Sequence, residues 1–169
     1  MHPLATLTLS AALATAVLAC SAPALAQSKP AAAAGPSACT LLTRPDVQKV
    51  TGRDPMVDAE SSAGGTICHY GIAQLIVRTG PKSWESIEDT LKSFKHDKEP
   101  RQAVSGFGDR AFLMFPKPAN KYQDDVALLV TQVGPHTLAL TVDAPDGKCP
   151  QDMRPAVESL MRTALSRLR

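Results

Sequence analysis

The sequence of 169 residues has little net charge and few aromatic side chains, and both shortages exclude kinds of partner. A formal net charge of +2 provides neither the basic surface of a nucleic-acid-binding protein nor an acidic tail. Aromatic residues make up only 4%, and Trp84 and Phe94 fall on the apolar stripe of a predicted helix. That position favours a place in the core over a platform for stacking bases or sugars. We therefore expect no nucleic-acid partner.

Common catalytic and metal-binding motifs are also missing. No C-x-x-C, H-x-x-x-H or H-E-x-x-H pattern occurs, so Cys68, His69, His136 and Cys149 are a weak basis for a metal site. There is no G-x-S-x-G elbow for a nucleophilic serine. The G-F-G-D sequence at 106–109 lacks the third glycine and the following helix of a phosphate loop. It predicts a tight turn or bulge in which Asp109 bonds N–H groups of its own loop. We expect no catalytic residue, no cofactor and no metal, and hence no enzyme.

No apolar run is long enough to cross a membrane. The run at residues 4–18 is too short for a stable span. This run is followed by Ala24 and Ala26, which occupy the two small-residue positions that signal peptidase requires. The pattern predicts a signal peptide over residues 1–26, although no Lys or Arg precedes the apolar run. The alternative is cleavage before Cys20, which would then be lipidated. We expect an exported protein, periplasmic or secreted, or else anchored to the membrane through this lipid alone.

The rest of the chain divides into a tether and one domain. Residues 27–37, QSKPAAAAGPS, contain no pattern that could bury a face and predict a flexible Pro/Ala-rich tether. Residues 38–169 have a common size for a single domain. The segment at 53–65 is polar and glycine-rich, which is typical of a loop or an irregular sheet edge.

The clearest strand pattern lies at 126–142, VALLVTQVGPHTLALTV. After a Gly-Pro turn, Leu138, Leu140 and Val142 alternate with smaller or polar residues, which is the period of a strand with one buried face. The two halves predict a hairpin near the middle of an antiparallel sheet. Shorter strands are predicted by the sequences at 66–70, 74–78 and 111–115.

Three helices are predicted. Thr43 and Asp46 form a capping box for the first, which Gly52 ends. Ser83 is the predicted N-cap of the second, whose apolar stripe includes Trp84, Ile87, Leu91 and Phe94. The third runs over 153–168. The order α-β-β-α-β-β-β-α predicts an α+β fold, with an antiparallel sheet of about five strands and helices mainly on one face.

Three cysteines remain after the predicted signal peptide: Cys39, Cys68 and Cys149. In an oxidising compartment two of them should pair and leave one thiol. Cys149 lies between Lys148 and Pro150, just before a helix, where positive charge and a helix N-terminus favour the thiolate. It is therefore either an activated thiol or an ordinary structural cysteine.

Short motifs follow one another in a characteristic order: Cys39-x-Leu41-Leu42-Thr43-x-x-Asp46-Val47, Gly52, Cys68-x-Tyr70, and Val104-x-Gly106-x-Gly108-Asp109-x-Ala111. Their order and spacing resemble those of the DUF3558-like proteins, small exported proteins and lipoproteins of bacteria whose function is unknown. The resemblance covers most of the chain after the signal peptide. It implies an α+β domain with a disulfide between Cys39 and Cys68, and no catalytic residue. Cys149 lies outside these motifs, and a Cys39–Cys149 bridge is the alternative.

These observations predict a non-catalytic binding or interaction module of the cell envelope. Its partner would be an envelope protein or a small ligand, bound at an uncovered face or edge of the sheet. The predicted solvent face of the hairpin has few charges and consists of Thr131, Gln132, Thr137, Ala139 and Thr141. The alternatives are a ligand or metal carrier with a pocket between helices and sheet, and a thiol-dependent enzyme that uses Cys149 with a histidine.

Overall fold

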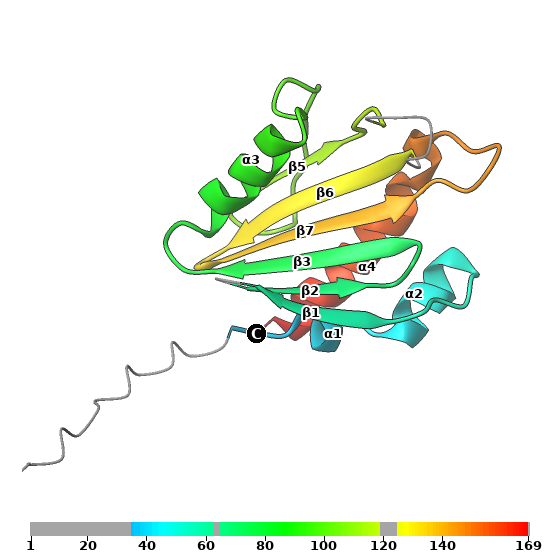
Figure 1. Ribbon diagram of the computed structural model, residues 1–169, viewed down its shortest axis with the longest axis horizontal. Helices are drawn as coiled ribbons and strands as arrows, with labels where there is room; N and C mark the ends of the chain where they lie inside the picture. Colours follow the sequence, from blue (N-terminus) through cyan, green and yellow to red (C-terminus); the bar gives the residue numbers. More distant parts are fainter. Residues whose placement is uncertain (1–34, 63–64, 119–124, 169) are drawn as a thin grey trace, which may run out of the picture. The chain divides into compact units, whose positions relative to one another are not determined.

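The computed structural model describes residues 35–62, 65–118 and 125–168 (Figure 1). The predicted signal peptide, Cys20 and most of the predicted tether lie outside the described residues. In chain order the elements are α1 (Ala38–Leu41), α2 (Arg44–Thr51), β1 (Asp58–Ser62), β2 (Gly65–His69), β3 (Ala73–Thr79), α3 (Ser83–Ser93), β4 (Gln102–Ala103), β5 (Arg110–Met114), β6 (Val126–Val133), β7 (His136–Asp143), the 3-10 helix η1 (Pro150–Met153) and α4 (Arg154–Arg167). Among these helices, none is both long and apolar enough to span a membrane.

The strands form one antiparallel sheet in the order β1-β2-β3-β7-β6-β5-β4. The predicted hairpin, β6 and β7, lies at its centre, and the α+β class is confirmed (Figure 1). The prediction of about five strands omitted the two edges, β1 and β4. Strand β1 falls within the segment 53–65. Its own sequence, D-A-E-S-S, has no apolar alternation. Its strand conformation is accounted for by backbone pairing with β2.

The helices lie mainly on one face of the sheet, as predicted. Side chains of α1, α2 and α4 join β3 and β7 in the main core, and the strands pass in front of α4 in Figure 1. The apolar stripe of α4 contributes four buried residues to this core: Val157, Leu160, Met161 and Ala164. Helix α3 packs on the opposite face, where Ile87 and Leu91 cover the middle of the sheet. The sheet is therefore buried on both sides near its centre.

The position of α3 corrects the expected solvent face of the hairpin. Thr137 and Ala139 are buried, because α3 covers them, and only Thr141 and Gln132 of that set remain partly exposed. Thr131 belongs to the other face, since it lies opposite Leu138 in the β6–β7 register. Its hydroxyl donates to the buried carbonyl of Phe107. On the hairpin, this face is therefore open only in part.

Helix α2 has the predicted caps, whereas α3 departs from prediction at both ends. Thr43 and Asp46 form the capping box of α2, and Gly52 ends it with φ 71°. The N-cap of α3 is Lys82 instead of Ser83; Ser83 is buried and accepts a 2.9 Å hydrogen bond from the Thr137 hydroxyl. The helix stops at Ser93, so Phe94 is not a core residue and is 60% exposed.

A disulfide and an ion pair are among the contacts that tie the N-terminal segment to the rest of the domain. The predicted disulfide between Cys39 and Cys68 is present and joins α1 to β2, with 5.1 Å between the two Cα atoms. Arg167, in the last turn of α4, donates to both Asp46 carboxylate oxygens at 2.5 and 2.9 Å. The Arg167 guanidinium, together with donors on Thr43, holds the pKa of the Asp46 carboxyl well below its usual range. The capping box of α2 thereby also anchors the end of α4.

A candidate ligand groove beside helix α3

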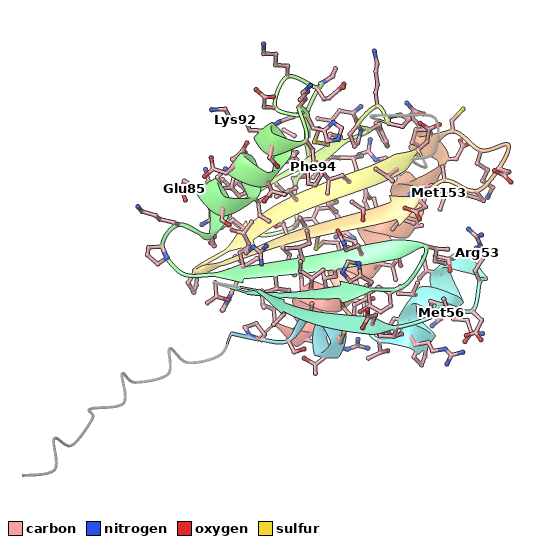
Figure 2. All side chains as sticks on the ribbon, viewed as in Figure 1. Arg53, Met56, Glu85, Lys92, Phe94 and Met153 are labelled. Atoms are coloured by element: carbon pink, nitrogen blue, oxygen red, sulfur yellow. A yellow bond between two sulfur atoms is a disulfide. The ribbon has the colours of Figure 1, made fainter. Side chains whose placement is uncertain are left out.

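A groove of about 230 Å³ lies between α3 and the open part of the sheet. Its wall is the apolar side of α3, namely Ile87, Thr90, Leu91 and, just past the helix end, Phe94. These positions fall at i, i+3, i+4 and i+7, so they share one helix face. The charged residues Glu85 and Lys92 lie on the other side of the helix from Phe94 in Figure 2. One face of α3 is therefore directed toward the groove and the other toward solvent.

The floor of the groove is formed by alternate residues of the three central strands. It consists of Gln74 and Ile76 of β3, Ala139 and Thr141 of β7, and Val126 and Leu128 of β6. Ile76 lies opposite Ala139, and Gln74 opposite Thr141, so these side chains share a face of the sheet. Because strand residues alternate between faces, their neighbours Leu75 and Leu140 point into the main core instead.

The polar groups of the floor and wall already have partners within the protein. The Thr90 hydroxyl donates to the Ser86 carbonyl at 2.9 Å, and the Thr141 hydroxyl to the Gln74 carbonyl at 3.5 Å. The Gln74 Nε2 atom lies 2.9 Å from Nδ1 of His69. Since these donors are engaged, the interior of the groove is effectively apolar toward a ligand.

The rim of the groove carries its ionisable groups. The segment that follows β5 contributes Pro116, Lys117 and Pro118, and the segment that follows α3 contributes His96. The His96 ring stacks on Phe94 with 6.4 Å between ring centroids. Among the described residues that line the groove, none has a carboxylate or a thiol, and Lys117 is the one with a permanent charge.

Aromatic contacts at the other end of α3 fix its position on the sheet. Trp84 meets Phe112 edge-to-face at 5.7 Å, and the guanidinium of Arg110 lies 3.9 Å from the centroid of Trp84. Arg101 stacks over Phe112 and makes two 2.8 Å hydrogen bonds to the carboxylate of Glu88. Such pairs are individually modest, but together they prevent α3 from sliding across the sheet.

The residues singled out in the sequence do not meet in this groove. The Cys39–Cys68 bridge packs in the main core on the other face, so Cys68 has no free thiolate for a metal. No group of three or more His, Cys, Asp or Glu side chains within the described ranges is arranged to hold a metal ion.

Cys149 is exposed and unpaired, and its backbone N–H donates to Asp152 at 3.0 Å. Cys149 lies beyond the loop that follows β7, whereas His136 is the first residue of that strand, and no hydrogen bond joins the two. His136 lies within 3.0 Å of the Thr79 hydroxyl. A pairing of Cys149 with His136 for catalysis is therefore not formed in this fold.

The G-F-G-D turn also differs from prediction. The Asp109 carboxylate accepts a 2.7 Å hydrogen bond from the N–H of Gly134, which belongs to the β6–β7 turn and not to its own loop. Asp109 thus connects two loops that are distant in sequence, a structural role that local turn rules do not predict.

Sequence reasoning missed the groove because its lining comes from separate segments. Two features could have indicated it: the apolar stripe that continues past α3 to Phe94, and the Pro-Lys-Pro sequence that stops β5 beside it.

Comparison with known proteins adds nothing, since no family model, curated protein or solved structure matches the chain. The resemblance to the DUF3558-like proteins rests on the short motifs alone.

Proposed function

We propose that the protein is an exported, non-catalytic binding module that takes an apolar ligand into the groove beside α3. The observation that carries this proposal is the groove itself, a concave apolar surface whose own polar groups are already paired. Phe94, 60% exposed at its wall, gains burial when a ligand fills the groove. A stable monomer has no folding benefit from leaving this side chain in water.

The size of the groove favours a small ligand. Its volume of about 230 Å³ falls below the roughly 300–1,000 Å³ of pockets for drug-sized molecules. A folded protein partner is better suited to a flat surface than to this hollow between a helix and a sheet. The aromatic and cation–π contacts of Trp84 keep the hollow open by holding α3 in place.

A neutral apolar ligand of matching size tests the groove. We expect 1-octanol to bind the wild-type chain in isothermal titration calorimetry, and Thr141→Phe to weaken its binding at least about tenfold, which corresponds to about 1.4 kcal/mol. The new ring would stand on the groove floor, at a position that is only partly buried. Thr163→Phe, on α4 and outside the groove, is the matched control and should bind as the wild type does. Equal binding by both variants, or no binding by the wild type, would show that the groove is not a binding site.

Export is supported by the N-terminal sequence, with its short apolar run and the Ala24-x-Ala26 pattern. We expect the mature chain from the source organism to begin at Gln27. Intact-mass spectrometry of the native protein measures this directly. A diacylglyceryl mass on Cys20 would instead make it a lipoprotein, and a chain retaining residues 1–26 would contradict export by signal cleavage.

A further inference from the structure

We propose that the ligand of this groove is a small aliphatic carboxylate, with its hydrocarbon chain over the sheet and its carboxylate at the rim beside Lys117 and His96. This inference rests on the proposed function and specifies the chemistry that the groove selects. The apolar lining accounts for the binding of a ligand, and the groups at the rim select its end group.

The volume of the groove sets the length of the chain. Water-sized groups occupy roughly 30 Å³ each, so about 230 Å³ holds about eight non-hydrogen atoms. The apolar residues of α3 form the wall and those of β3, β7 and β6 the floor, so a hydrocarbon chain meets apolar side chains on two sides. Each methylene buried there contributes about 0.8 kcal/mol. A carboxylic acid of about eight carbons fits, with its head group at the rim.

The charges around the groove set the identity of the head group. Inside, the hydroxyl donors of Thr90 and Thr141 are engaged with backbone carbonyls, which leaves no free hydroxyl donor for a polar group there. At the rim, neither the Lys117 ammonium nor the His96 ring has a hydrogen-bond partner or an ion-pair partner among the described residues. Because Lys117 and His96 are not balanced by a carboxylate among the described lining residues, an anionic end group is complementary to them and a cationic one is not.

The contact between Phe94 and His96 links the two parts of the ligand. The rings stack at an interplanar angle of 25°, with the aromatic side chain in the wall and the imidazole at the rim. A chain that covers Phe94 therefore ends beside a ring that can donate a hydrogen bond. A ligand with both an apolar tail and an acceptor is matched by this pair, and a purely apolar ligand uses only half of it.

Octanoate and 1-octanol, which share a chain length, test the inference by isothermal titration calorimetry of the full chain. We expect octanoate to bind the wild type at least about tenfold more tightly than octanol does. The double variant Lys117→Gln/His96→Gln should lose this preference, with octanol binding unchanged. Lys92→Gln, on the outer side of α3, is the matched charge control and should keep the preference.

The outcomes distinguish this inference from the function on which it rests. Equal binding of octanoate and octanol by the wild type overturns the carboxylate assignment and leaves the groove as an apolar site. A preference for octanoate that survives the double variant overturns the roles of Lys117 and His96. Failure of both octyl compounds to bind overturns the proposed function itself.

Discussion

Replacing both Cys39 and Cys68 by alanine should lower the free energy of unfolding by about 3–4 kcal/mol. The bridge links residues that are 29 apart in sequence, and its removal returns the entropy of that loop to the unfolded chain. It also detaches α1, a single helical turn, from the strand that it covers. Urea denaturation followed by circular dichroism measures the difference, and we expect the unfolding midpoint to fall with it.

The matched control is Cys149→Ala. Cys149 is exposed and outside the bridge, so this variant should change the free energy of unfolding by less than about 0.5 kcal/mol. If Cys149→Ala instead showed the large loss and the double variant were as stable as the wild type, the bridge would not join Cys39 to Cys68. The alternative Cys39–Cys149 pairing would give losses in both.

Gly108→Ala should cost about 3–5 kcal/mol of stability, the other large effect. Gly108 has φ 120°, a conformation that side-chain-bearing residues rarely adopt. A Cβ at this position would also collide with the backbone carbonyl of Gln132 and with the side chain of Val133. The close approach is fixed by the adjoining hydrogen bond, in which the Asp109 N–H donates to the Gln132 carbonyl at 2.8 Å. Backbone strain and overpacking therefore add.

Gly147→Ala separates conformational strain from the collision. Gly147 has φ 80°, but no atom lies within 4 Å of the position that its Cβ would take. Its loss should be limited to about 1–2 kcal/mol, the cost of the left-handed conformation alone. Urea denaturation of both variants, or the yield of soluble protein if Gly108→Ala does not fold, gives the comparison. Similar losses in the two variants would mean that β6 does not confine Gly108.

Elements defined by local chemistry were predictable from the sequence. The box formed by Thr43 and Asp46 and the glycine at 52 delimit α2, because each acts on backbone groups within one turn. The β6–β7 hairpin likewise follows from an apolar run before one turn and an alternating run after it. Edge strands were not predictable in this way, since the sequence D-A-E-S-S of β1 and the two residues of β4 have no apolar alternation, and backbone pairing to a neighbour accounts for both strands.

The location of α3 shows why the candidate site was not predictable. Its apolar stripe specifies that Ile87 and Leu91 are buried, but not which face of the sheet they cover. The stripe also includes Phe94, which the helix end leaves in the wall of the groove instead of the core. The rim residues His96 and Lys117 come from separate connecting segments. Only the assembled sheet brings these residues together.

The strand order has a consequence for how the chain is synthesised. The inner neighbour of β3 is β7, and their nearest paired residues, Thr79 and His136, are 57 apart in sequence. A chain that ends after β3 therefore lacks the strand that pairs with the inner edge of β3, which includes the apolar residues Leu75 and Val77. Such an edge pairs readily with other chains. Products that end before β7 should accordingly aggregate, and the domain becomes self-contained only when nearly all of it has been translated.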